Sequence, residues 1–485
     1  MVASKTQPIV NKEVVSTSID LKTAQLPATV TIPAVPEKEH KAISIIFPQS
    51  DYDVIFDESQ GTIQEAVFKR YKDYRFNLKT GFSLDDQILN FRKTAISAQA
   101  ISFVAEDPNK RITKSFNFLN SNYGIDLEIK IQNLTNGPLS FNLPLNLGIL
   151  DFSGNQEAAR FQEITVVTDE KTLRPNAHKD AYFDRLKFVA IRDRYFCAII
   201  EPENNFQGFI KKLGPQESEI GVISKDIIIP ANQAQVLKFH IYLGPQELRS
   251  INAVKPAWST VIYYGMFDII SHILLQALDL LYKIVHNWGW AIILLSLLVY
   301  FALYPLTLKQ MRSMKDMQAI QPKIEALRKE YKDNPQKLNK EIMELYREHK
   351  VNPFGGCLPL VLQMPIFFAL YQALMRSIVL KGAKFLWIKD LSEPDRLFTL
   401  PQSLPVLGNE INILPIIMAI GMFVQQKMSM TSMSGSGAEQ QKIMLIIMPI
   451  MFGIIFYHMP AGLVLYWFVN SMLMLIYQIR VSRAK

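Results

Sequence analysis

Polar but uncharged side chains recur inside the most apolar segments of this chain. Ser296 and Tyr300 lie four residues apart in one such segment, and Tyr466 and Asn470 lie four apart in another. Residues at this spacing share one face of a helix. Their hydroxyl and amide groups make hydrogen bonds, so they either join neighbouring helices or line a wet, uncharged groove into which a hydrophilic segment could slide.

The sequence has no arrangement of residues typical of a catalytic or metal site. Its seven histidines are scattered, and it contains no H-E-x-x-H, G-x-S-x-G, P-loop or G-x-G-x-x-G motif. The two cysteines, Cys197 and Cys357, can build neither a disulfide framework nor a metal cluster. We therefore expect no enzymatic activity, no cofactor and no metal.

Five apolar segments in the second half of the chain are predicted to cross a membrane as helices and to carry these polar groups. Three of them are long enough for a hydrocarbon layer of about 30 Å, and the two short ones would thin the bilayer locally. Gln363 and Gln426 add one polar group to each of two further segments. The five segments are residues 289–308, 353–380, 411–427, 441–457 and 461–480.

A charge-dense stretch, residues 309–352, separates the first two apolar segments. Two apolar stripes at helical spacing flank Asp333-Asn334-Pro335, in which Asn334 is the expected N-cap and Pro335 the first helical residue. The pattern predicts a helical hairpin that is either a solvated loop or a docking arm for a nascent chain, a ribosome or a targeting factor. Its candidate contact residues are Lys323, Arg328, Lys329, Lys337 and Lys340.

The first half of the chain has the composition of a soluble protein. Residues 1–41 are polar and contain several prolines, which is typical of a flexible linker. Residues 42–252 alternate in short β-type runs between turn residues, and this predicts a large antiparallel sandwich. Residues 257–286 either span the membrane or, as we interpret them, lie in its interface as an amphipathic helix. The polar stripe of that helix is Asp268, His272, Gln276, Asp279 and Lys283.

Charge predicts the topology of the membrane segments. Residues 309–350 contain eleven Lys or Arg against seven Asp or Glu, and the chain ends in further basic residues, so both regions belong in the cytoplasm. Five spans then place the sandwich on the opposite side, outside the membrane. No apolar run precedes the sandwich to export it. Either an N-terminal anchor is missing, which we favour, or residues 257–286 span and the sandwich is cytoplasmic.

The second half of the chain resembles the YidC family of membrane protein insertases. The resemblance covers residues 257–485. Residues 42–252 resemble the large periplasmic β-supersandwich of the Gram-negative members in their pattern of short β-type runs and in their position in the chain. The motifs that carry it are Asn287-Trp-Gly289, Tyr304-Pro-Leu306, Gln321-Pro-Lys-Ile324, Val351-Asn-Pro-Phe-Gly-Gly-Cys357, Gln363-Met-Pro-Ile366, Leu386-Trp387, Gln426-Lys-Met-Ser429, Gln441-Lys-Ile443 and Gly462-Leu-Val-Leu-Tyr466.

The resemblance implies a multidomain protein of the bacterial inner membrane: a periplasmic β-supersandwich, a five-span helical bundle and a cytoplasmic hairpin. Such proteins insert nascent membrane proteins into the lipid bilayer, alone or beside the Sec translocon. The family carries a groove arginine at the position of Tyr300, so here the groove is expected to be polar without charge. Gly355 and Gly356 are interpreted as a hinge into the bundle. The expected groove residues are Ser296, Tyr300, Gln363, Gln426, Tyr466, Trp467 and Asn470.

Two other functions fit parts of the sequence. A solute transporter could use the polar helix faces as a substrate path, although inverted repeats and an intramembrane charge, typical of transporters, are not visible. The sandwich could instead be a glycan-binding module on a membrane anchor, because the supersandwich resembles sugar-mutarotase folds. A binding screen of residues 42–252 would separate that function from insertion.

Overall fold

The chain divides into two units, Met1–Lys41 and Ala42–Lys485, of which only the second is described. The expected linker, residues 1–41, and the expected hinge, Gly355 and Gly356, lie outside the described residues. The computed structural model describes residues 44–84, 89–120, 123–154, 159–349, 358–404, 408–430 and 438–483.

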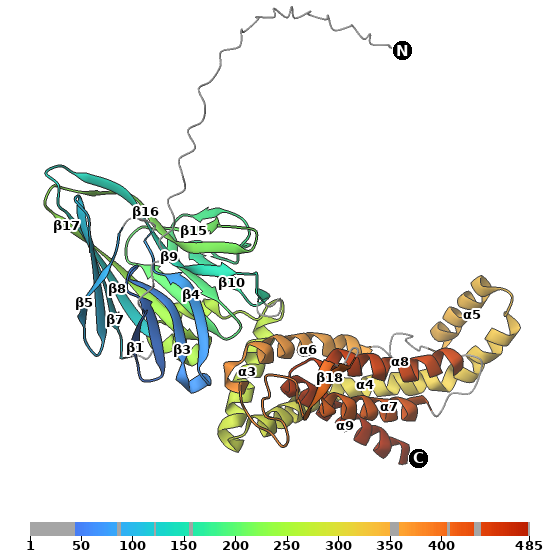
Figure 1. Ribbon diagram of the computed structural model, residues 1–485. Coiled ribbons are helices and arrows are strands. Elements are labelled where there is room, and N and C mark those ends of the chain that lie inside the picture. Colours follow the sequence, from blue (N-terminus) through green and yellow to red (C-terminus); the bar gives the residue numbers. More distant parts are fainter. Residues whose placement is uncertain are drawn as a thin grey trace, which may run out of the picture. The chain divides into compact units, whose positions relative to one another are not determined.

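The first half of the described chain is a β-sandwich of antiparallel sheets, as the alternating sequence pattern predicts (Figure 1). The largest sheet has nine strands, ordered β11 (Thr172–Leu173), β10 (Glu163–Thr168), β13 (Leu186–Arg192), β14 (Phe196–Pro202), β17 (Ala234–Pro245), β8 (Gly124–Asn133), β7 (Lys110–Phe118), β6 (Ala100–Glu106) and β5 (Arg92–Ile96).

Two four-stranded sheets complete the β domain. One is ordered β12 (Ala181–Phe183), β15 (Gln207–Lys212), β16 (Glu217–Ile229) and β9 (Leu139–Asp151). The other is ordered β1 (Ser44–Pro48), β2 (Tyr52–Asp57), β3 (Thr62–Phe68) and β4 (Tyr74–Gly81), with the 3-10 turn η1 (Lys69–Tyr71) after β3.

Aromatic packing fills the space between the sheets. The ring of Phe56 lies 5.4 Å from that of Phe103 and 5.1 Å from that of Phe116, and all three side chains are fully buried. Along β7, alternate residues point inward, so Lys114 occupies a core position beside Phe116. Its Nζ donates to the carbonyl oxygen of Gly61 at 2.8 Å and lies 4.8 Å from the centre of the Phe91 ring.

The buried amine gives the first prediction. Burial lowers the pKa of Lys114 from its ordinary value to about 7, so between pH 7 and 10 the unfolded chain binds more protons at this residue than the folded chain. Stability relative to a Lys114→Met variant should therefore rise with pH, by up to about 1.4 kcal/mol per unit. Thermal unfolding of both full chains in detergent at pH 7, 8 and 9 measures this. A difference that stays constant with pH would contradict it.

The segment between the two halves differs from the expected helix over 257–286. The short helix α2 (Leu248–Val254) and the 3-10 turn η2 (Pro256–Val261) pack on the β domain, and Trp258 is buried in its core. The indole Nε1 of Trp258 donates to Glu201 at 2.6 Å. Gly265 then turns the chain at a φ of +87°, and helix α3 (Asp268–Val285) begins at residue 268 rather than at residue 257. The apolar residues at the start of the predicted helix thus belong to the sandwich core.

The second half is a set of helices, all of which except α5 contribute to one apolar core. Figure 1 shows the long helix α4 reaching away from this core to a turn, where α5 folds back along it. The helices are α4 (Trp288–Glu330), α5 (Pro335–Glu348), α6 (Leu358–Arg376), α7 (Ile413–Met430), α8 (Ala438–Tyr457) and α9 (Ala461–Arg483). Between α6 and α7 lie the 3-10 turn η4 (Ile378–Leu380) and a hairpin of β18 (Phe398–Leu404) and β19 (Gly408–Ile411).

Helix α8 begins at Ala438 rather than at residue 441, α9 ends at Arg483 rather than at residue 480, and three further boundaries differ from the sequence expectation. The expected span 289–308 and the first arm of the hairpin 309–352 are one continuous helix, α4. The expected span 353–380 ends as a helix at Arg376, because Ile378 of η4 packs into the core of the β domain. The expected span 411–427 begins at Ile413, since Ile411 pairs with Phe398 as the last residue of a strand.

Two helical segments in the described part of the chain are long and apolar enough to cross a membrane, Trp288–Leu306 and Ala461–Arg480. Ile413–Met428 and Leu445–Tyr457 are apolar but shorter. The predicted cap of the hairpin is confirmed, because the side chain of Asn334 accepts a hydrogen bond from the backbone N–H of Lys337 and Pro335 begins α5.

Candidate functional site

A hydrogen bond between two expected groove residues joins α6 to α9. The Nε2 of Gln363 donates to the hydroxyl of Tyr466 at 2.9 Å. Tyr466 is fully buried, and its backbone carbonyl accepts from the side chain of Asn470, one turn later, at 2.9 Å. Three residues from two of the predicted segments therefore form one contiguous polar patch inside the helical core.

Helix α4 carries two more of the expected residues. The hydroxyl of Ser296 is fully buried and donates to the carbonyl oxygen of Ile292 at 2.8 Å, within its own helix. Tyr300 is half-buried, with its ring 6.2 Å from that of Tyr304. Tyr304 in turn meets the ring of Tyr477 on α9 edge-on at 6.2 Å.

Tyr304 and Tyr477 were not among the expected site residues. Both were detectable by spacing, because Tyr304 lies one turn after Tyr300 and Tyr477 lies eleven residues after Tyr466, which is about three helical turns. The described structure thus shows a row of hydroxyl-bearing rings between α4 and α9. No Asp, Glu, Lys or Arg occurs in residues 288–308 or 461–479.

Two expected groove residues lie elsewhere. Trp467 packs in an aromatic cluster, with its ring 5.8 Å from Phe452, 5.4 Å from Phe456 and 5.3 Å from Phe367. Gln426 is half-buried near the end of α7. The structure brings Gln363, Tyr466 and Asn470 together, and it places Trp467 against apolar rings rather than polar groups.

The basic residues of the hairpin are at its surface. The apolar side of α4 buries Ile320 and Ile324 against α5. Outside this contact, the Nζ of Lys323 lies 2.7 Å from His349 Nε2 and that of Lys337 lies 4.7 Å from the centre of the Tyr331 ring. The remaining predicted contact residues are the half-buried Arg328 and the exposed Lys329 and Lys340.

An ion cluster ties the end of α6 to the β domain. Glu163 on β10 pairs with Arg376 at 2.5 Å and also with Arg192 on β13, whose side chain is almost fully buried. Burial alone would raise the pKa of Glu163, but the two guanidinium groups hold it below its usual value. One carboxylate therefore compensates two cations.

A second arginine reinforces this junction. The guanidinium of Arg194 donates to the carbonyl oxygen of Met375 at 2.8 Å and to that of Ser392 at 3.0 Å. The sequence places Arg376 in the expected span 353–380 and gives no sign of its partners. Glu163 and Arg376 are 213 residues apart, so no local pattern could pair them.

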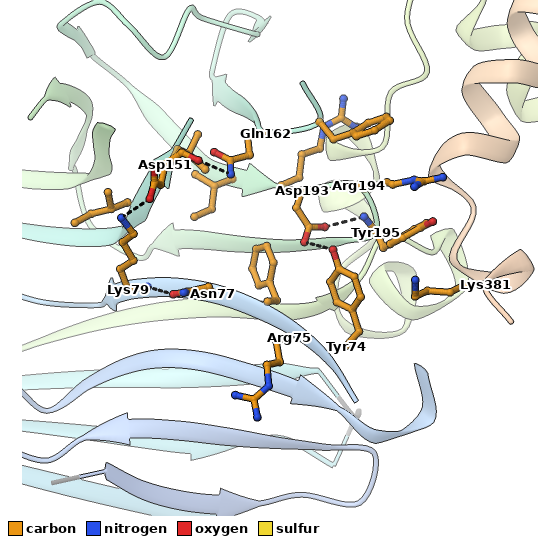
Figure 2. Close-up of a pocket in the computed structure, with 16 residues that line it drawn as sticks. Tyr74, Arg75, Asn77, Lys79, Asp151, Gln162, Asp193, Arg194, Tyr195 and Lys381 are labelled. Atoms are coloured by element: carbon orange, nitrogen blue, oxygen red, sulfur yellow. Dashed lines mark hydrogen bonds and ion pairs between the residues drawn. The ribbon is translucent and has the colours of Figure 1, made fainter. Parts of the chain in front are cut away.

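The β domain also contains a cavity of about 460 Å³ beside this junction (Figure 2). Asp193 in its wall accepts hydrogen bonds from the Tyr74 hydroxyl at 2.9 Å and from the backbone N–H groups of Tyr195 and Phe196, both at 2.7 Å. Burial raises the pKa of Asp193 to about 6 in spite of these bonds. The carboxylate is committed to holding the turn at residues 193–196, and none of the expected groove residues lines this cavity.

The fold and the polar patch together define a class of protein: a β-sandwich joined to apolar helices whose core contains uncharged hydrogen-bonding groups. Residues 280–485 match the family model described as 60Kd inner membrane protein, and residues 77–277 match that of the YidC periplasmic domain. The membrane protein insertase YidC of Syntrophobacter fumaroxidans is 36% identical over 79% of this chain and 71% of its own length. That of Burkholderia multivorans is 30% identical over 94% of this chain and 87% of its own.

The chain therefore belongs to the YidC family of membrane protein insertases. The family is not one of enzymes, and it consists of inner-membrane proteins with a periplasmic domain that act on nascent membrane proteins at the lipid bilayer. A solved structure of YidC from Thermotoga maritima is 15% identical and covers 90% of this chain and 99% of its own, with a TM-score of 0.33. A galactose mutarotase-like protein from Lactobacillus casei is 8% identical, covers 41% of this chain and 99% of its own, and also has a TM-score of 0.33. Both TM-scores are too low to indicate a function.

Proposed function

We propose that this chain moves hydrophilic segments of nascent membrane proteins through an uncharged polar groove and releases their apolar spans into the bilayer. The observation that carries the proposal is the patch of Gln363, Tyr466 and Asn470 beside the ring row that begins at Tyr300. Such groups can form hydrogen bonds with the polar backbone of a translocating segment. Each backbone N–H or C=O group without a partner in hydrocarbon costs roughly several kcal/mol. Because residues 288–308 and 461–479 contain no Asp, Glu, Lys or Arg, hydration and hydrogen bonding supply the attraction.

The proposed topology has five spans. The helices α4, α6, α7, α8 and α9 cross the membrane, α3 lies in the outer interface, the β domain is periplasmic, and the hairpin and the C-terminus are cytoplasmic. In this arrangement Gly355 and Gly356 are the hinge between hairpin and bundle. The basic residues of the hairpin contact a ribosome, a targeting factor or the nascent chain, and the Sec translocon is a partner for larger clients.

Site-specific photocrosslinking tests the groove. We expect a crosslinker at Tyr300 or Ser296 to capture a small two-span client during its insertion. Leu298 is the matched control, because it lies on the same helix with half of its side chain exposed on another face. Normal insertion of the client in cells depleted of this protein, or equal capture at Leu298 and Tyr300, would refute the proposal.

Removal of the hydrogen bond between Gln363 and Tyr466 should affect insertion more than stability. Gln363→Leu leaves the buried Tyr466 hydroxyl without its donor, and such a bond is worth about 1 kcal/mol in a membrane protein. We expect the thermal unfolding temperature to fall only slightly and the insertion of a client with a polar translocated segment to fall several-fold. Gln372→Leu is the control, since nine residues along a helix place Gln372 on the opposite face of α6. Equal losses in both variants would assign Gln363 a packing role only.

A further inference from the structure

A cavity of about 820 Å³ lies between the β domain, helix α3 and the segment after α6. We call it the α3 cavity. The polar stripe of α3 faces it through His272, Gln276, Asp279 and Lys283. The 3-10 turn η1 contributes Arg70, and helix α2 contributes Arg249. The stripe that the sequence singled out as a mark of an amphipathic helix therefore lines one wall of an open cavity.

The charges around the α3 cavity are predominantly positive. Four basic residues line it against two acidic ones, and both acidic groups are already engaged. Asp279 pairs with Lys283 at 2.8 Å, and Glu247 accepts from the Tyr71 hydroxyl at 3.1 Å.

Two guanidinium groups of this wall are left for a ligand. Arg70 and Arg249 are both exposed in the cavity wall, and neither forms an ion pair with a carboxylate of the described residues. Both line the α3 cavity, in which Arg70 lies over the Tyr71 ring at 5.8 Å and Tyr71 bonds to Glu247 at the start of α2. The cavity thus offers two guanidinium groups to an anion, and planar guanidinium groups suit phosphate oxygens.

Helix α3 provides a different surface next to this polar wall. Ile269, Ile273, Leu280 and Ile284 form an apolar stripe whose side chains are 60% to 77% exposed. At about 100° per residue, this stripe lies beside the polar stripe, while the buried stripe of Leu274 and Leu278 lies on the other side of the helix. At the end of α3, Tyr282 stacks on Trp288 at 4.0 Å, and such aromatic residues are typical of a membrane interface.

We propose that the α3 cavity binds the phosphate-bearing head group of a phospholipid from the adjacent leaflet. Arg70 and Arg249 bind the phosphate, and the acyl chains lie along the exposed stripe of Ile269, Ile273, Leu280 and Ile284. A phospholipid is the occupant that matches both surfaces, since its phosphate meets the guanidinium groups while its acyl chains join the lipid around the apolar stripe. The site rests on the proposed position of α3 at the bilayer surface.

Native mass spectrometry of the detergent-purified full chain tests this site with two probes of equal acyl chains, dioleoyl phosphatidylglycerol and dioleoylglycerol. We expect the phospholipid to bind at least tenfold more tightly than the phosphate-free lipid. The double variant Arg70→Gln/Arg249→Gln should lose at least this tenfold preference. Arg111→Gln/Arg185→Gln is the control, because it removes the same charge from two surface arginines of the β domain that pair with exposed carboxylates.

Three results would overturn the proposal: equal binding of the two lipids, an unchanged preference in the Arg70/Arg249 variant, or displacement of the phospholipid by millimolar inorganic phosphate. The last result would indicate a free-anion site instead. No client protein is present in this measurement, so a failure of the groove mechanism in the crosslinking assay leaves its outcome untouched.

Discussion

Replacing Glu163 with glutamine is expected to destabilise the junction between the β domain and α6 by about 3 kcal/mol. Without the carboxylate, the guanidinium groups of Arg192 and Arg376 remain mutually repelling and largely buried, with 1% and 10% of their side chains exposed. Removing the common partner of two buried cations costs more than removing one of the cations. Thermal unfolding of the full chain in detergent, with hydrogen exchange at β10 and at the end of α6, measures the loss.

Two comparisons make this prediction specific. Arg376→Met leaves a balanced pair of Glu163 and Arg192, so it should destabilise less than Glu163→Gln. Glu170→Gln breaks a pair with Arg185 in which both side chains are about 70% exposed, and it should change stability by less than about 1 kcal/mol. If Glu163→Gln proves as mild as Glu170→Gln, the cluster does not hold the junction.

Acid should weaken the same cluster. The pKa of Glu163 is lowered in the folded chain, so its contribution to stability is complete above its unfolded pKa of about 4.3 and is lost as the pH falls through the folded value. The difference in unfolding temperature between wild type and Glu163→Gln should therefore be largest at pH 6 to 7 and shrink below pH 4. A difference that is independent of pH would contradict the ionic origin of the effect.

Gly289→Ala is expected to have the second large effect, because no space exists for a methyl group at this position. A Cβ on Gly289 would lie 2.1 Å from the Phe385 ring. That ring is buried and meets Trp290 edge-on, and the backbone of Phe385 is fixed by a pair of hydrogen bonds to Ile388 at 3.0 and 2.8 Å. Overpacking of this kind costs about 1–3 kcal/mol or more, which outweighs the gain of up to about 1 kcal/mol in helix propensity.

Gly421→Ala is the matched control in another apolar helix. Its Cβ would meet only the terminal methyl of Met472, at 2.5 Å, and that flexible side chain can move aside. We expect Gly289→Ala to lower the unfolding temperature and Gly421→Ala to leave it unchanged or raise it. The double variant Gly289→Ala/Phe385→Leu should be less destabilised than the sum of its single variants, and strict additivity would show that the two residues do not collide.

The division into a β half and an apolar helical half could be predicted because both depend on local patterns. Alternation along β7 identifies the inward residues, and the capping pair Asn334 and Pro335 fixes the start of α5. The same reasoning misassigned Trp258, because an apolar run before a helix looks like its first turn. Only the tertiary contact with Glu201 shows that this residue belongs to the β domain.

The candidate groove could be predicted only in part, because local spacing does not encode contacts between helices. A spacing of four residues predicted that Ser296 and Tyr300 share one helix face and that Tyr466 and Asn470 share another. It could not predict which helices pack against each other. The bond from Gln363 to Tyr466 and the ion pair from Glu163 to Arg376 join residues 103 and 213 positions apart. Such contacts depend on the packing of whole elements, which no periodicity encodes.

The continuity of α4 has a mechanical consequence. Its 43 residues make a rod of about 65 Å, which carries the buried hydroxyl of Ser296 near one end and the α5 contact of Ile320 and Ile324 near the other. A force on the hairpin is therefore transmitted to Tyr300 through one continuous helix, with no loop between them. The compliance of this rod is concentrated at Pro305 and Pro322, where the backbone lacks an N–H for the helical ladder. Bending of α4 at these two prolines therefore determines how much a movement of the hairpin displaces the apolar part of the helix.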